Sequence, residues 1–342
     1  MYYNEAFVQE VRANPQADAP RLIFADYLEE EGDPLSEFIR VQVQLSQPDC
    51  VGPARAPLEI REKELLGQYA EGWLGPLREL GAEGVSTRCF QRGLIERIRI
   101  RSTKFMKNGE EICRISPALH VLDLRAPDKG AQRLLKYKMP KQITSLDLSA
   151  NGLGEPRGGN ADDTEETSEL MNQLCQAAWL PQIRELNLQF NRLGEAGMAA
   201  LSAVEFRQLT ALWLDVNKID AGAIQLLAGS DSFKHLQKLS LKSNLLGDPG
   251  AKHLAKAKNL QQLEFLDLSS NRIGNPGAKA IAESKTLGSL KTLLLRANQI
   301  KKTGYEHLAK AQFPQLEHLD IRNNNEAPTT TLKTKYKDGL VA

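Results

Sequence analysis

One pattern of leucines recurs along most of this chain and constrains its fold more than any other feature. The segments that begin at Ile183, Leu209, Leu236, Leu263 and Leu290 all fit the frame L-x-x-L-x-L-x-x-N-x-L. Successive asparagines of the frame are 40, 26, 27, 27, 27 and 26 residues apart. A fixed period of about 20–50 residues is the signature of stacked structural repeats. The asparagines are Asn151, Asn191, Asn217, Asn244, Asn271, Asn298 and Asn324.

Each copy of the frame predicts one strand followed by one helix. Residues of L-x-L alternate between two faces, as they do in a strand. Asp248-Pro249 and Asn275-Pro276 stand where the next helices begin, so we expect Asp248 and Asn275 to cap their own helices. Because a lone strand and helix cannot bury their apolar faces, neighbouring copies must stack. Strands stack about 4.8 Å apart and helices about 10 Å apart, which bends the stack with the strands inside.

The frame resembles the leucine-rich repeat family, in its ribonuclease-inhibitor-like subclass, over residues 93–325. The resemblance implies an α/β fold, namely a curved solenoid of about nine repeats with parallel strands on the concave side and helices on the convex side. The two earliest copies are weaker, with Thr103 and Pro127 in the asparagine slot. We expect the asparagines to be structural, because an amide at a turn can satisfy neighbouring backbone groups.

Residues 1–92 lack the repeat and are predicted to form a mainly helical capping domain. Apolar spacing and breakers predict helices over 6–12, 19–31, 35–45 and 58–74. The string PRLIFADYLEEEGDPLSEFIRVQVQL resembles a companion domain found beside repeat modules in bacterial proteins of planctomycete type. Tyr27 stands where that pattern has Trp. The resemblance implies no biochemical activity for this domain.

The distribution of charge also separates two domains. The 342 residues carry 44 Lys and Arg against 43 Asp and Glu, yet residues 1–92 hold 9 against 16 and the remainder holds 35 against 27. Such an asymmetry between parts of a chain indicates separate domains. About 13 extra residues near 155–168, rich in Gly and acids, predict a surface insertion. Residues 326–342 form a C-terminal tail.

Motifs for catalysis and metal binding are missing from the sequence. No G-x-S-x-G, H-E-x-x-H or C-x-x-C pattern occurs. We therefore predict no catalytic residue, cofactor or metal site, and no enzyme. No apolar run of about 18 residues and no secretory signal occur, so we expect no membrane span and a cytoplasmic location. The cysteines share no close spacing, which favours reduced thiols: Cys50, Cys89, Cys113 and Cys175.

Two further groups of residues have conventional explanations. Glycine-rich segments at 247–252 and 274–279 have the wrong spacing for a phosphate loop, and repeat turns account for them. Carboxylates cluster in the helical segment, but such clusters on short helices usually form solvated faces or caps. These carboxylates are Asp26, Glu29, Glu30, Asp33 and Glu37.

The strand face of the repeats is the predicted functional surface. Outward strand positions carry Trp213, Phe265 and Leu294 within four successive repeats, whereas Asp147, Glu185 and Asp215 make the middle of the face acidic. Apolar groups beside cations are typical of protein interfaces. We therefore predict a non-catalytic scaffold that binds a protein or peptide on the concave face. The predicted partner-binding residues are Trp213, Phe265, Leu294, Lys238, Lys242 and Arg296.

A cluster of arginines lies on the first two predicted strands. Because the preceding domain is acidic, we expect it to dock on Arg97, Arg99, Arg101 and Arg125. Four arginines without interleaved aromatics are weak evidence for nucleic-acid binding, which we do not favour. Two alternatives stay open. One is a regulator of an enzyme, similar to repeat-type GTPase activators or nuclease inhibitors, and the other is a hydrolase within residues 1–92.

Overall fold

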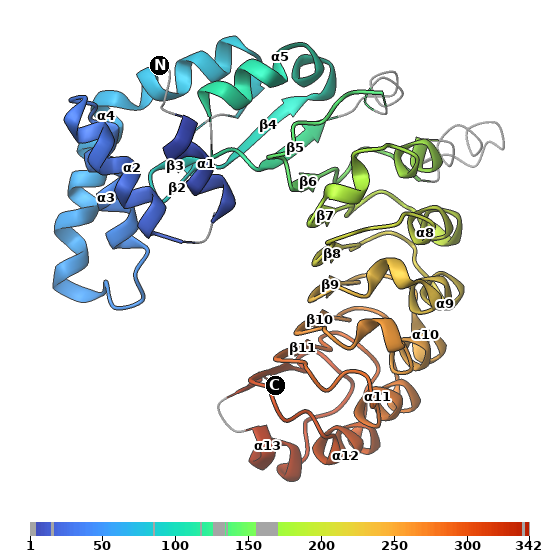
Figure 1. Cartoon of the computed structure of the whole chain (residues 1–342). Coiled ribbons are helices and arrows are strands. Elements are labelled where there is room, and N and C mark those ends of the chain that lie inside the picture. Colours follow the sequence, from blue (N-terminus) through green and yellow to red (C-terminus); the bar gives the residue numbers. More distant parts are fainter. Residues whose placement is uncertain are drawn as a thin grey trace. The chain divides into compact units, whose positions relative to one another are not determined.

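The chain divides into two compact units, each of which is described by itself (Figure 1). Unit 1 comprises Met1–Gly130 and Tyr137–Leu146, and unit 2 comprises Ala131–Lys136 and Asp147–Ala342. The insertion predicted near 155–168 lies outside the described residues. The computed structural model describes residues 5–14, 17–84, 86–116, 118–125, 134, 136–154, 170–336 and 339–341.

Unit 1 begins with four α-helices and continues into short strands. Its helices are α1 (Glu5–Ala13), α2 (Ala19–Glu30), α3 (Leu35–Leu45), η1 (Gly52–Ala54), α4 (Arg55–Glu79), η2 (Thr87–Cys89) and α5 (Ser102–Ile115). Its strands are β1 (Ala82–Glu83), β2 (Phe90–Gln91), β3 (Leu94–Ile95), β4 (Arg97–Arg101), β5 (Val121–Arg125) and the start of β6 (Ser145–Asp147). The helices agree with those predicted, except that α4 is longer at both ends. Pro57 lies in its first turn, where a missing N–H costs nothing.

Aromatic side chains hold the helices of unit 1 against the β2–β3 hairpin. The ring of Phe38 on α3 is fully buried, 5.0 Å from the ring of Trp73 and 5.1 Å from that of Phe90. Gly93 lies in the hairpin turn with φ +87°, and a Cβ there would stand 2.3 Å from Cα of Ile39. Only glycine allows this close approach, so the hairpin and α3 pack backbone against backbone.

A buried ion pair links α2 to the segment before β4. Arg21 is fully buried and its guanidinium donates to the carboxylate of Glu96, which is also buried. Burial lowers the pKa of Arg21, and the neighbouring charge of Glu96 opposes that shift. The guanidinium also donates to the carbonyl of Gln91 at 3.4 Å. Arg21 of the N-terminal motif therefore connects the helices to the first repeat strand.

The strand series of unit 1 starts with an antiparallel pair. β1 pairs with β4 through Ala82 and Ile100, and β4 pairs in parallel with β5 over its five residues. The first strand of the parallel series thus has a partner strand from residues 1–92. An edge strand with unpaired backbone groups invites association with other chains, and β1 prevents this at β4.

Unit 2 repeats a strand and a helix along the chain. Its strands are β7 (Glu185–Asn187), β8 (Ala211–Trp213), β9 (Lys238–Ser240), β10 (Phe265–Asp267), β11 (Thr292–Leu294), β12 (His318–Asp320) and β13 (Leu340–Val341). Its helices are η3 (Leu180–Gln182), α8 (Gly194–Ser202), α9 (Ala221–Gly229), η4 (Asp231–Phe233), α10 (Gly247–Leu254), η5 (Lys258–Leu260), α11 (Asn275–Ala282), α12 (Lys302–Lys310) and α13 (Thr330–Tyr336).

The strands of unit 2 form a parallel sheet in chain order from β7 to β13. Equivalent residues of successive repeats lie opposite one another, and the fully buried Leu212 pairs with Leu239. Figure 1 shows the strands along one side of the array and α8–α12 along the other, with the helices more widely spaced. The predicted α/β curved solenoid with an N-terminal helical region is confirmed.

The asparagine residues of the frame form one hydrogen-bonded series, which we call the Asn ladder. The amide of Asn244 donates to the carbonyls of Leu214 and Leu241, both at 2.9 Å, and its Oδ1 accepts from the backbone N–H groups of Asn217 and Ile219 at 2.9 and 3.0 Å. Asn244 is buried. One side chain therefore ties its own turn to the preceding repeat. Similar bonds are made by Asn191, Asn217, Asn271, Asn298 and Asn324.

The predicted helix caps at Asp248 and Asn275 are wrong, because each residue caps the helix of the following repeat. Oδ1 of Asp248 accepts from Gly274 and Gly277 at the start of α11, both at 2.8 Å. Asn275 does the same for Lys301 and Gly304 at the start of α12. A Cβ at Gly277 would lie 2.6 Å from that Asp248 oxygen. The glycine is needed for the close approach, and a sequence pattern within one repeat cannot show it.

We predict that Asn244→Ala lowers the free energy of unfolding by about 1–3 kcal/mol. The substitution leaves buried backbone N–H and C=O groups without partners in a central turn. Chemical denaturation measures the change, with Asn325→Ala, at an exposed position, as the matched control. The control is expected to change stability by less than about 0.5 kcal/mol. Equal midpoints for Asn244→Ala and the control would contradict a structural role for the ladder.

We predict that Glu96→Gln destabilises the protein by about 3 kcal/mol, because it leaves the buried charge of Arg21 uncompensated. Glu83→Gln is the control, since it removes a carboxylate from the exposed pair with Arg101, and such pairs contribute less than about 1 kcal/mol. Thermal unfolding of both variants tests the difference. Similar unfolding temperatures for the two would show that the buried pair has no special importance.

Candidate functional site

Several carboxylates on the strand face of unit 2 accept hydrogen bonds from the backbone of their own repeats. Oδ1 of Asp147 accepts from the N–H of the residue two positions later, Ser149, at 2.9 Å. Oδ1 of Asn187, Asp267 and Asp320 likewise accepts from the N–H two positions later, at 2.8–3.0 Å. Asp267 and Asp320 are buried. Asp147 of the predicted acidic stretch therefore closes its own turn, as do Asn187, Asp267 and Asp320 in other repeats.

Asp215 also turns its carboxylate into the protein. Its oxygens accept from the Ser240 hydroxyl, from the N–H of Lys242 at 3.1 Å and from the amide of Gln189 at 2.6 Å. Burial raises the pKa of Asp215, and repulsion from Asp267 adds to the shift while these hydrogen bonds oppose it. On β12, burial would raise the pKa of Asp320, but the hydrogen bonds from Arg322 lower it overall.

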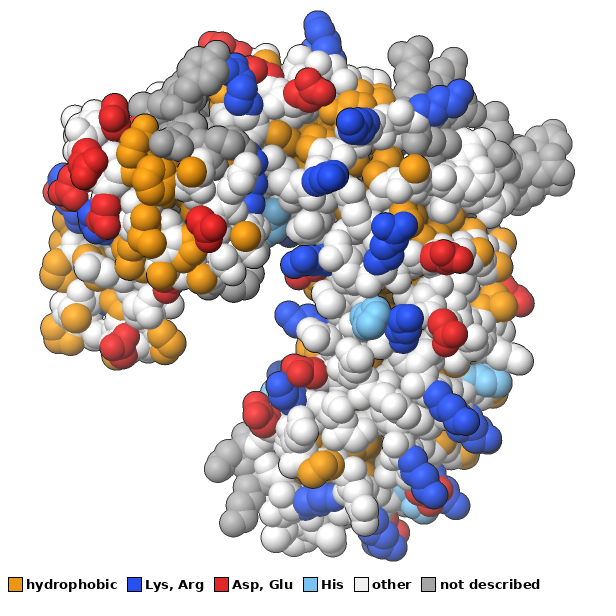
Figure 2. Space-filling model, viewed as in Figure 1, with side chains coloured by type: hydrophobic (Ala, Val, Ile, Leu, Met, Phe, Trp, Pro, Cys, Tyr) orange, Lys and Arg blue, Asp and Glu red, His pale blue; other side chains and the backbone are white. Residues whose placement is uncertain are grey.

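The cations of this face, in contrast, extend into solvent. Lys238 and Lys242 are exposed, and within the part of the chain that the structure describes neither has an acidic side chain within ion-pair distance. Arg296 is exposed and its guanidinium faces the Asn323 amide at 3.1 Å. Figure 2 shows Lys and Arg side chains along the strand side of unit 2. Lys238, Lys242 and Arg296 are therefore exposed on this face, whereas Asp267 and Asp320 are buried.

The three apolar residues predicted on this face are half-buried. Trp213 pairs with Ser240 on β9, and Leu294 pairs with Asp267 on β10. Phe265 lies in the neighbouring row, opposite Lys238 and Thr292. Three strand spacings place Trp213 and Leu294 about 14 Å apart. The strands therefore bring the residues onto one face, separated by polar side chains.

Two apolar residues at the edge of this face were not predicted from the sequence. Phe190 and Val216 directly precede ladder asparagines, with side chains 57% and 38% exposed. Their backbones are left-handed, with φ of 60° and 57°. The sequence does contain a signal for them: an aromatic and a β-branched residue occupy a turn position that holds a small or polar residue in the other repeats. Such residues rarely adopt this conformation.

The arginine cluster lies in unit 1 and is largely paired. Asp123 on β5 accepts from Arg99 at 2.6 Å and lies 3.4 Å from Arg125. Arg101 pairs with Glu83 of β1 at 2.8 Å. Arg97 is exposed. Arg101 thus contacts a carboxylate from residues 1–92, Arg99 contacts one of the next repeat, and Arg125 contacts one of its own strand.

The carboxylates of the N-terminal helices also have structural partners. Asp26 and Glu29 pair with Arg40, and Glu37 pairs with Arg61. The pair lowers the pKa of Glu37, chiefly through the hydrogen bond from Arg61. Oδ1 of Asp33 accepts from the N–H of Leu35 at the start of α3, at 2.9 Å. These contacts explain the carboxylate cluster as pairs and a cap. Among the described residues, no group of three or more His, Cys, Asp or Glu side chains could hold a metal ion.

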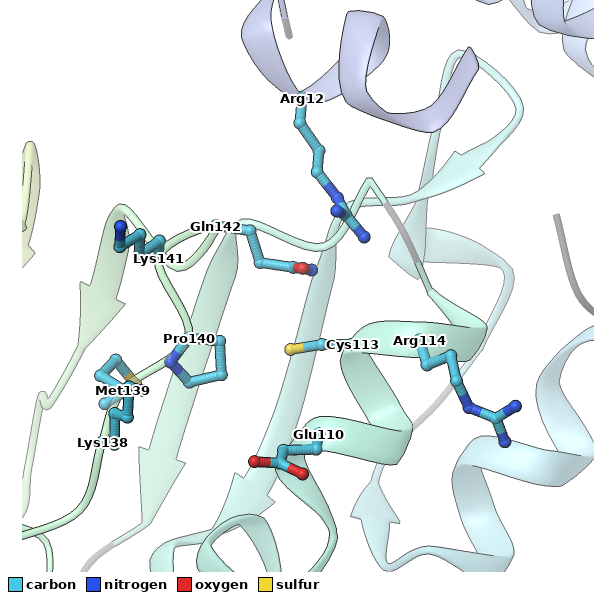
Figure 3. Close-up of a pocket in the computed structure, with 9 residues that line it drawn as sticks. All are labelled: Arg12, Glu110, Cys113, Arg114, Lys138, Met139, Pro140, Lys141 and Gln142. Atoms are coloured by element: carbon cyan, nitrogen blue, oxygen red, sulfur yellow. The ribbon is translucent and has the colours of Figure 1, made fainter. Parts of the chain in front are cut away.

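A pocket of about 360 Å³ opens in unit 1 between α1, α5 and the segment before β6. Figure 3 shows Arg12, Cys113 and Gln142 pointing toward one another, whereas Arg114 points away. Arg114 pairs with Glu111. Burial raises the pKa of Cys113 to about 12, so this thiol stays protonated and is not a nucleophile at neutral pH. The full lining is Arg12, Glu110, Cys113, Arg114, Lys138, Met139, Pro140, Lys141 and Gln142.

Comparison with known proteins agrees with this geometry at the level of the repeat. Residues 181–202, 234–255 and 259–282 match the family model described as Leucine Rich repeat. No curated protein matches the chain. Within the described residues, no helix is long and apolar enough to cross a membrane. The matched repeats, together with the strand and helix of each copy, support a leucine-rich repeat protein.

Three solved structures are similar at low identity. A Bacteroides fragilis protein, a structural genomics target, has 14% identity and a TM-score of 0.44, with 70% of this chain and 69% of that chain covered. Listeria monocytogenes InlP has 17% identity and a TM-score of 0.35, with 60% and 56% covered. TLR13 in a complex with ssRNA13 has 19% identity and a TM-score of 0.39, with 75% and 36% covered.

We predict that Cys113 and Cys175 resist thiol reagents in the native protein. Burial raises the pKa of both thiols to about 12, which leaves almost no thiolate at pH 8. Cys50 and Cys89, which are half-buried, are expected to react first with Ellman's reagent, and all four thiols should react in denaturant. Cys113→Ser is the control and should leave the native reaction unchanged. Rapid native labelling of Cys113 would contradict the prediction.

Proposed function

We propose that this chain is a non-catalytic scaffold that binds a protein or peptide on the strand face of unit 2. The observation that carries the proposal is the placement of the half-buried Trp213, Phe265 and Leu294 on the same face as the exposed Lys238 and Lys242, for which the described part of the chain holds no ion-pair partner. Aromatic side chains are enriched among the residues that contribute most to protein interfaces. Leucine-rich repeat proteins commonly serve as such scaffolds.

The charge of the face supports a partner with acidic side chains. The carboxylates of Asp215, Asp267 and Asp320 are bonded to the backbone or to neighbouring side chains, whereas Lys238 and Lys242 extend into solvent. Charges at the margin of an interface govern the association rate and the choice of partner more than the affinity. We therefore propose that Lys238, Lys242 and Arg296 attract an acidic partner.

The spacing of the apolar residues supports an extended partner segment. Trp213 and Leu294 are about 14 Å apart across three strand spacings, with Phe265 between them in chain order. An extended chain advances about 3.3 Å per residue, so about four residues span that distance. A short apolar segment laid across the strands could contact all three residues.

Several finer assignments are part of the same proposal. The steps of 26–27 residues and the helix in each repeat support the ribonuclease-inhibitor-like subclass. The N-terminal motif supports a companion domain of planctomycete type in residues 1–92, and we propose a cytoplasmic location. A partner that is a GTPase or a nuclease would instead favour the regulator hypothesis, and activity without a partner would favour a hydrolase.

We predict that Trp213→Ala combined with Phe265→Ala weakens partner binding by about 2 kcal/mol or more, because central aromatic anchors contribute at least this much. The partner is first isolated from native cytosol with the full chain and identified by mass spectrometry. Its affinity for each variant is then measured by titration calorimetry.

Ile60→Ala is the control for this experiment, because it truncates an apolar residue of α4 that is 59% exposed and far from β8 in the sequence. It should bind the partner normally. The unfolding temperature of the double variant should change little. If the double variant loses stability strongly but binds normally, Trp213 and Phe265 are packing residues and the proposed surface is wrong.

A further inference from the structure

The residue before each ladder asparagine adopts a left-handed backbone. Its φ lies between 54° and 60° in every described repeat with this turn, from Ala150 to Asn323. Small or polar residues suit this position, since a large or branched side chain collides with its own backbone there. The residues at this position are Ala150, Phe190, Val216, Ser243, Ser270, Ala297 and Asn323.

Phe190 and Val216 break this rule. Their side chains are 57% and 38% exposed, so neither belongs to the fully buried core. Val is β-branched, which makes a positive φ a true outlier. Local rules that a sequence breaks without structural compensation tend to mark functional sites. The two residues lie in consecutive repeats, which makes them one feature.

The turn geometry places the two side chains next to each other at the edge of the strand face. The N–H of Phe190 donates to the carbonyl of Asp215 at 2.9 Å, and the N–H of Val216 donates to the carbonyl of Lys242 at 3.0 Å. Phe190 and Val216 are therefore equivalent positions one strand spacing apart, about 4.8 Å. Trp213 is the last residue of β8 and lies three residues before Val216 in the following turn, so this edge continues the face proposed above.

We propose that Phe190 and Val216 form an apolar edge that receives an apolar side chain of an acidic, extended peptide segment. The proposal rests on the proposed function and names the chemistry of the partner. Charge complementarity supports it, because the backbone of Val216 is bonded to that of Lys242, whose side chain is exposed and has no acidic partner among the described residues. The carboxylate of Asp215 accepts three hydrogen bonds and points inward.

The test replaces both residues by asparagine, which adopts the left-handed conformation readily. Phe190→Asn with Val216→Asn should raise the unfolding temperature by about 2 °C or more, since strain is removed. The same variant should bind an acidic apolar probe at least ten-fold more weakly. The probe is a fluorescein-labelled peptide of twelve residues, glutamate-rich with two leucines three positions apart, measured by anisotropy with the full chain.

Two controls make the result specific. Ser243→Asn with Ser270→Asn changes the same turn position in the next two repeats and should leave binding unchanged. A lysine-rich peptide with the same leucines should bind at least ten-fold more weakly than the acidic one. Failure of the acidic peptide to bind, equal binding of the two peptides, or unchanged binding by the asparagine variant would each overturn the proposal.

The outcome also separates this inference from the proposed function. If Trp213→Ala with Phe265→Ala abolishes capture of the cytosolic partner while the asparagine variant retains it, the strand face binds and the apolar edge does not. If the asparagine variant weakens peptide binding while the alanine pair leaves partner capture intact, the edge binds by itself and the proposed strand face is wrong.

Discussion

The hydrogen bonds of one asparagine side chain per repeat hold the turns of unit 2 together. Asn244 bonds to backbone groups of its own turn and of the preceding repeat, and Asn271 repeats the arrangement one step on. Because each amide bonds only to its own turn and to the adjacent one, the stability of each repeat is coupled to that of its neighbours, as in other repeat proteins. The helices are joined by the same principle, since Asp248 on one repeat caps α11 on the next. Strand turns and helix starts thus depend on the adjacent copy.

The hydrogen bonds between adjacent repeats also determine which polar groups are available to bind a partner. The N-terminal ends of α11 and α12 are already filled by Asp248 and Asn275, so the glycine-rich segment at 274–279, where α11 begins, has no free N–H groups at Gly274 and Gly277 for a phosphate. On the strand face, Asp267 and Asp320 close their own turns. These two carboxylates are therefore buried in the turns, whereas Lys238 and Lys242 stay exposed.

The repeat, its period and the order of strand and helix could be predicted because leucine and asparagine recur at fixed steps. The four N-terminal helices could be placed from apolar spacing and from breakers such as Gly32 and Pro34. Contacts between repeats could not be predicted from the sequence. The cap and the close approach at Gly277, for example, both depend on Asp248, which lies 29 positions earlier in the chain. The alternation of residues predicts outward strand positions, but Trp213 is half-buried and Asp267 is buried, because exposure at these positions depends on the neighbouring strands. The left-handed turns at Phe190 and Val216 follow from backbone geometry that the frame does not encode.

A fold built from nearest-neighbour contacts can tolerate such local strain. In a single globular core, an unfavourable turn disturbs packing in many directions, because interiors are close-packed. In a repeat array, each turn contacts only the turns before and after it, and the ladder bonds of Asn191 and Asn217 hold the backbone beside Phe190 and Val216 in place. The cost of exposing apolar side chains in a left-handed turn therefore stays within two repeats. Surface residues of the strand edge can vary for binding while the leucines and asparagines behind them keep the array intact.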